Sequence, residues 1–175
     1  MIQKSIIRIL PFVCLLAFSV IPSVSGDSIT ARDIVERIKK NVTCEWAAET
    51  VDTFKAGNPD DPVTGIAVTF MATMDVLKKA AEAGCNFIIT HEPTFYNHLD
   101  EIADLKDDPV LTAKQNFIRE HNLIVFRFHD HIHMTDPDGI VKGMVRAIGW
   151  ERFVKTGETI VFDIPRSPSK RWPRN

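Results

Sequence analysis

The sequence has little cysteine and no strong charge of either sign. Only three of its 175 residues are cysteines, and the net charge at pH 7 is -2. So small a net charge gives no indication of a nucleic-acid partner. One cysteine, Cys14, lies in the apolar N-terminal stretch, which leaves Cys44 and Cys85 in the rest of the chain. One disulfide is therefore conceivable in an oxidising compartment, but the spacing does not demand it.

Several motifs with well-defined chemistry are also missing. The sequence contains no GxSxG elbow, no phosphate-binding GxxxxGK[ST] loop and no GxGxxG fingerprint. Cys44 and Cys85 have no obvious histidine partner. These absences disfavour a nucleophilic hydrolase and an enzyme that uses a nucleotide cofactor.

The two ends of the chain differ from an otherwise globular composition. Hydrophobic residues make up 45% and charged residues 25% of the sequence, which is typical of a single folded domain. Residues 1–26 have a basic start, an apolar run and small residues at the end, a pattern that predicts a cleaved secretory signal. A membrane anchor is the alternative, but the apolar run is short and contains prolines. We therefore expect a secreted or periplasmic protein without a membrane segment after cleavage, and a disordered basic tail at 166–175.

Between these ends, strand and helix patterns alternate. Thr30 and Asp33 form the pattern of a capping box at the start of an amphipathic helix. Turn-forming residues at 57–62 are expected to end whatever element precedes them. The elements predicted after them are strands at 65–70, 86–90 and 123–128, helices at 74–84, 109–121 and 137–149, and short strands at 151–154 and 159–164. Continuous apolar strands separated by helices predict an α/β fold, a three-layer domain at 27–165 with a mostly parallel sheet.

Polar clusters follow two of the predicted strands. His91 and Glu92 come after the strand "NFIIT", and the segment "HDHIH" at 129–133 comes after "LIVFRF". Since the carboxyl ends of parallel strands meet at one edge of a sheet, we expect the clusters to be neighbours. If the third strand simply continues, His129, His131 and His133 point to one side.

Imidazoles and carboxylates that converge in this way are suitable ligands for a divalent ion such as zinc, manganese or iron. A hydrogen-bonded polar rim and a metal-free acid–base site that uses histidine and glutamate are the alternatives. His98 and His121 each stand alone in the sequence, and we assign them no function.

Two long segments carry a resemblance to a known family. "GIAVTFMATMDVLKKAAEAGCNFIITHEPTFY" and "HNLIVFRFHDHIHMTDPDGIVKGMVRAIGW" resemble the N-terminal half of the NIF-three-like proteins, dinuclear metal centre proteins often described as homologues of GTP cyclohydrolase I type 2. The family's metal-binding His-His-Pro motif corresponds to His91, Glu92 and Pro93. Its His-Thr-Asn-Leu-Asp motif places His129 at the histidine and His133 at the aspartate.

The resemblance implies a metal site made of His91, Glu92, His129 and His133. It gives no metal role to His131, in disagreement with the strand pattern, and we follow the resemblance on this point. With a bound ion, Glu92 or Asp130 would assist proton transfer. The predicted function is therefore an exported divalent-metal-binding protein, with metal-dependent hydrolysis of an unknown small molecule as its activity.

Two other interpretations stay open. Family members carry a second α/β half in which a His and a Glu complete a two-metal site, whereas this sequence ends at "RSPSKRWPRN". A shifted reading frame, a premature stop or a true single-domain variant would each explain this. A truncated, non-catalytic scaffold or assembly subunit is thus one alternative, and a one-metal hydrolase with a His-x-His pair is another. The resemblance also implies ring-like oligomers, and apolar surface left uncovered by a missing half would favour self-association.

Overall fold

The computed structural model describes residues 28–155 and 161–164. The predicted signal at 1–26 and the predicted tail at 166–175 lie outside the described residues. The elements, in chain order, are α1 (Ala31–Asn41), β1 (Phe54–Ala56), β2 (Ile66–Thr69), α2 (Met74–Glu82), β3 (Phe87–Thr90), the 3-10 helix η1 (Ala103–Leu105), α3 (Pro109–Glu120), β4 (Ile124–Arg127), α4 (Asp130–Met134), α5 (Gly139–Ala147) and the 3-10 helix η2 (Glu151–Phe153).

Four strands form one sheet in the order β1-β4-β3-β2. β2, β3 and β4 are parallel, and their register aligns Ile66 with Phe87 and Phe87 with Ile124. α2 connects β2 to β3, and α3 connects β3 to β4, so both predicted strand-helix-strand units are present. The carboxyl ends of the three parallel strands therefore lie at the same edge of the sheet.

The sequence patterns missed the edge strand β1. This strand has only three residues, and it pairs antiparallel with β4 through an irregular register. A strand this short shows no periodicity of its own, and the turn residues at 57–62 that follow it indicated a loop. The sheet is thus mostly parallel with one antiparallel edge.

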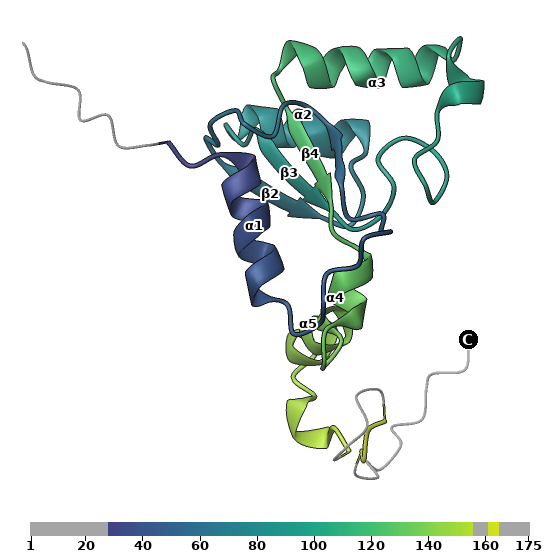
Figure 1. Cartoon of the computed structure of the whole chain (residues 1–175). Helices are drawn as coiled ribbons and strands as arrows, with labels where there is room; N and C mark the ends of the chain where they lie inside the picture. The colour runs from purple at the N-terminus through teal and green to yellow at the C-terminus, as the bar shows by residue number, and fades with distance from the viewer. Residues whose placement is uncertain (1–27, 156–160, 165–175) are drawn as a thin grey trace, which may run out of the picture.

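Helices cover both faces of the sheet and make three layers (Figure 1). On one face, α1 buries Ala31 and Val35 against Phe87, Ile124 and Phe126. On the opposite face, buried side chains of α2 and α3 pack against the alternate residues of β3 and β4; this cluster includes Leu77, Ala80, Ile88, Ile118 and Val125. Since successive strand residues point to opposite faces, the continuous apolar runs of β3 and β4 are explained by burial on both sides. The expectation of burial on both sides is wrong for β2, an edge strand whose Ile66 and Val68 are exposed.

The helices begin where polar side chains cap them. Thr30 and Asp33 form the predicted capping box of α1, and Thr73 accepts the backbone N–H of Val76 at the start of α2. Asp108 does the same for α3 by accepting the N–H of Leu111 at 2.7 Å. The last long helix begins at Gly139, two residues later than predicted, because Asp138 is its N-cap. Among the described helices, none is both long and apolar enough to cross a membrane.

The end of the described chain differs from the prediction. Residues 151–153, predicted as the start of a strand, form the 3-10 helix η2. Gly149, at a φ of 70°, ends α5 and reverses the chain, and the N–H of Phe153 then bonds to the Trp150 carbonyl at 2.9 Å. Of the predicted final strand, the described part makes one isolated bridge, between Val154 and Phe162. Cys44 and Cys85 are both free, so no disulfide joins them.

Candidate metal centre

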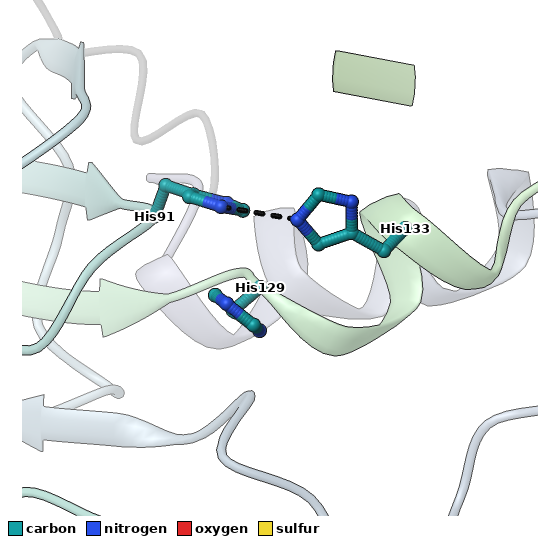
Figure 2. Close-up of side chains that lie close together, drawn as sticks. All are labelled: His91, His129 and His133. Atoms are coloured by element: carbon teal, nitrogen blue, oxygen red, sulfur yellow. Dashed lines mark hydrogen bonds between the residues drawn. The ribbon is translucent and has the colours of Figure 1, made fainter. Parts of the chain in front are cut away.

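Three histidines converge at the carboxyl edge of the sheet. His91 follows β3, His129 follows β4, and His133 lies in α4. One ring nitrogen from each of the three lies within 4.8 Å of the others. In Figure 2 the rings of His91 and His133 point toward one another, with 3.3 Å between their Nε2 atoms, and the ring of His129 lies beside them, stacked on that of His91 with 4.5 Å between centroids. The two polar clusters of the sequence are therefore neighbours, as predicted.

The second cluster is helical, which corrects the expectation of an extended strand. After His129 the chain turns into α4, and helical positions four apart lie on the same side. His129 and His133 consequently face His91 together, whereas His131 points the other way. The prediction that all three histidines of "HDHIH" share one face is therefore wrong, because it rested on the alternation of a strand.

His131 belongs to the core on the opposite side of α4. Its ring is fully buried and stacks on Trp46, with 3.7 Å between ring centroids. Its Nε2 accepts the backbone N–H of Ala47 at 2.8 Å, so its proton is on Nδ1, which donates to Asp52 at 2.6 Å. Both ring nitrogens are occupied by the protein, and His131 has a structural role.

Asp52 holds the first turn of α4 in place. This buried carboxylate accepts the backbone N–H groups of His129, Asp130 and His131 at 2.6, 2.9 and 2.9 Å. The first N–H groups of a helix have no partner within the helix, and an acidic side chain satisfies them with the favourable sign of charge. Sequence reasoning missed Asp52, since it lies 77 residues from His129 in the chain and no local pattern marks it.

Each histidine of the cluster has its Nδ1 directed at an acceptor. Nδ1 of His91 lies 3.3 Å from the Phe128 carbonyl, and Nδ1 of His129 lies 3.0 Å from the Asp130 carboxylate. Nδ1 of His133 lies 2.8 Å from the Asp138 carboxylate. An acceptor at Nδ1 places the imidazole proton there and leaves the lone pair of Nε2 available. This arrangement, a histidine with its outer nitrogen bonded to a carbonyl or carboxylate, is usual for metal ligands.

The spacing of the nitrogens also suits a metal ion. Two nitrogens bound at about 2.0–2.1 Å to one tetrahedral ion lie about 3.3 Å apart. The two Nε2 atoms of His91 and His133 are separated by 3.3 Å. With both protons on Nδ1, the two Nε2 lone pairs face each other, and a cation bound between them would stabilise that contact.

The electrostatics favour the neutral form of His91 and the ionised form of Asp130. Burial lowers the pKa of His91. The hydrogen bond to the Phe128 carbonyl acts in the opposite direction, and the neighbouring His129 and His133 lower the pKa further. Burial acts to raise the pKa of Asp130, but hydrogen bonds from Thr50, His129 and Val51 outweigh it and bring the pKa down to about 2. Neutral imidazoles are the form that binds metal.

The remaining predicted site residues lie around this group. Glu92 is adjacent to His91 in the chain, but its carboxylate is not one of the three converging groups. Asp130 faces Nδ1 of His129, and its other oxygen accepts the Thr50 hydroxyl at 2.7 Å. Its position is that of a group that orients His129. His121 stacks on Phe117 at the end of α3 and has no place in the cluster.

Fold and site together define a class: a three-layer α/β domain with a histidine cluster at the carboxyl edge of its parallel strands. Residues 29–164 match the family model of Duf34/NIF3 (NGG1p interacting factor 3). The chain belongs to this family, and the resemblance seen in the sequence is confirmed.

Individual relatives agree with the family assignment. The chain is 30% identical over 96 residues to a GTP cyclohydrolase 1 type 2 homolog of Clostridium acetobutylicum, a match that covers 55% of this chain and 34% of the relative. The fold is similar to that of Staphylococcus aureus protein SA1388, with a TM-score of 0.58 and 22% identity over 71% of this chain and 35% of that one. Reduced HcgD from Methanocaldococcus jannaschii has a TM-score of 0.53 and 21% identity, over 70% of this chain and 48% of that one. The chain thus spans about a third of the length of its curated relative.

The position of Asp52 leads to a prediction about stability. Replacing Asp52 with alanine leaves three backbone N–H groups and the ring of His131 without their acceptor, so we expect a loss of about 3–4 kcal/mol in the free energy of unfolding. Urea unfolding followed by circular dichroism measures it. Asp108→Ala is the matched control, because Asp108 caps α3 through a single hydrogen bond and its loss should cost about 1 kcal/mol. Equal losses in the two variants would contradict the special role of Asp52.

Proposed function

We propose that this protein binds a divalent metal ion through Nε2 of His91, His129 and His133. The observation that carries the proposal is the orientation of the three rings: each Nδ1 faces an acceptor, and each Nε2 is left for the metal. Because no carboxylate belongs to the converging group, zinc or iron fits better than manganese, which prefers oxygen ligands. Glu92, the fourth ligand predicted from the resemblance, is not needed for this set.

The chemistry proposed for the site is metal-assisted hydrolysis. His91, His129 and His133 would hold the ion, and the ion would supply a bound water with a pKa lowered towards about 7. The protein's own contribution is orientation: Asp130 fixes the ring of His129, and Asp138 fixes that of His133. Glu92, next to His91, is the residue that we propose for proton transfer, since the Asp130 carboxylate is a weak base with a pKa of about 2.

Alanine substitutions test the metal proposal. Removal of a partner that only orients a ligand costs 10–100-fold in metal affinity, so loss of a ligand should cost about a hundredfold or more. We expect His91→Ala, His129→Ala and His133→Ala each to abolish stoichiometric zinc binding at micromolar protein, with an unchanged circular dichroism spectrum. Metal analysis after dialysis against one equivalent of zinc measures this.

His121→Ala is the control, because His121 lies on α3 away from the cluster. It should keep the stoichiometry of the parent. A parent protein that retains less than about a tenth of an equivalent of zinc or iron after reconstitution would contradict the proposal, as would three cluster variants that bind like the parent.

A second candidate function, a non-catalytic assembly subunit, is favoured by an apolar surface beside the site. Large apolar side chains in and directly after β2, and along and directly after α5, are accessible to solvent: Ile66, Val68, Phe70, Ile140, Met144 and Ile148. Three of them, Val68, Phe70 and Ile140, line a groove of about 310 Å³ together with His91. We call the whole set the apolar strip. Exposed apolar side chains gathered around a groove are typical of protein–protein contacts.

We therefore propose self-association through the apolar strip. Light scattering at micromolar concentration should give a mass of at least a dimer, and Val68→Lys should reduce it towards the monomer because the introduced charge cannot be buried. Val110→Lys is the matched control: Val110 lies on α3, outside the strip, and is 69% exposed, compared with 78% for Val68. A parent that stays monomeric over a wide concentration range would contradict the proposal.

Export to the periplasm or the outside of the cell is also part of our proposal. It is supported by the sequence of residues 1–26 alone and stays a prediction, as do the substrate and the catalytic step.

A further inference from the structure

A buried arginine connects the metal centre to a histidine that the sequence left without a function. Arg127, the last residue of β4, is fully buried. Its Nε donates to the His91 carbonyl at 3.0 Å, and its Nη1 donates to the His98 carbonyl. Among the described residues, no carboxylate lies within ion-pair distance of this guanidinium. Its hydrogen bonds instead fix the loop that runs from His91 to His98.

The same guanidinium determines where the proton of His98 lies. Nη2 of Arg127 is 3.3 Å from Nδ1 of His98. A guanidinium can only donate hydrogen bonds, so Nδ1 of His98 accepts, and the neutral ring carries its proton on Nε2. The three histidines of the cluster hold their protons on Nδ1, which makes His98 the opposite tautomer. The cluster presents lone pairs to its centre, whereas His98 presents an N–H group.

The ring that carries this N–H group lies beside the three-histidine cluster. The ring of His98 stands edge-on to the ring of His129, with 5.4 Å between centroids and 79° between planes. His98 is exposed to solvent, and no described residue accepts a hydrogen bond from its Nε2. A donor that is fixed at one end by a buried cation and free at the other is suited to bind an acceptor from solution.

From this geometry we infer that His98 is a ligand-binding residue: its Nε2–H donates to an anionic oxygen that occupies the open side of the three-histidine centre. The inference rests on the proposed metal function and deepens it by naming the class of ligand, a small molecule that presents a phosphate or carboxylate oxygen. Such an oxygen accepts a hydrogen bond from the imidazole while it approaches the metal. A neutral donor of this type stabilises a developing negative charge without first losing a proton.

The simpler role, fastening of the loop, can be separated from ligand binding. Arg127 holds the loop through the backbone carbonyl of residue 98, and substitution of the His98 side chain does not remove that hydrogen bond. His98→Phe keeps a ring beside His129 but has no N–H group. His98→Gln keeps a donor on a side chain of similar reach. A purely structural role predicts that these two variants bind anions equally well.

The first test is a titration of the cobalt-loaded protein with inorganic phosphate, followed by the visible absorption of the metal. We expect His98→Phe to weaken phosphate binding about tenfold or more, the effect of losing a hydrogen bond to a charged group, while the cobalt stoichiometry stays that of the parent. His98→Gln should regain most of the affinity, and His121→Ala should not change it.

Unchanged phosphate affinity in cobalt-loaded His98→Phe would overturn the role of His98 and leave the metal proposal standing. A parent that takes up no cobalt would instead contradict the metal proposal itself. The tautomer is tested without metal: long-range proton–nitrogen NMR spectra at pH 8 should show the proton of His98 on Nε2, and a proton on Nδ1 would overturn the inference directly.

Discussion

The three-histidine cluster depends on one buried carboxylate, that of Asp52. It accepts three consecutive backbone N–H groups at the start of α4 and the ring N–H of His131. These four hydrogen bonds fix where the helix begins and how it is rotated about its axis. Rotation is the important variable, because α4 is short and carries a histidine on each of two opposite sides. With His131 held in the core, His129 and His133 necessarily face His91.

The acceptors behind the three histidines determine which ring nitrogen carries the proton. Asp130 and Asp138 are ionised and lie behind their histidines, so the lone pairs of the cluster point inward and the negative charges stay outside it. Hydrogen bonds from His133 and from backbone N–H groups overcome the effect of burial and lower the pKa of Asp138. A cation at the centre would therefore be bound by imidazole nitrogens. It would be stabilised by the two carboxylates that lie at Nδ1 of His129 and His133. Arg127 instead donates to Nδ1 of His98, which leaves the proton of that ring on Nε2.

Much of this could be predicted from the sequence, for physical reasons that also explain the failures. The parallel strands and their helices have strong local patterns, and the caps Thr30, Thr73 and Asp108 follow from the backbone groups that a helix end leaves unpaired. The meeting of His91 with His129 follows from topology. Three features depend on contacts between distant segments and have no local signal: Asp52, the edge strand β1 and the bond from Arg127 to His98. The helical turn after His129 was missed because Asp52 imposes it.

In the arrangement that we propose, three imidazoles bind a metal directly through Nε2. X-ray absorption spectroscopy of the zinc-loaded protein tests it most directly. We expect a four-coordinate ion with three imidazole nitrogens at about 2.0–2.1 Å, one additional nitrogen or oxygen ligand and no sulfur. A spectrum with fewer than two imidazoles, or with sulfur from Cys44 or Cys85, would contradict it.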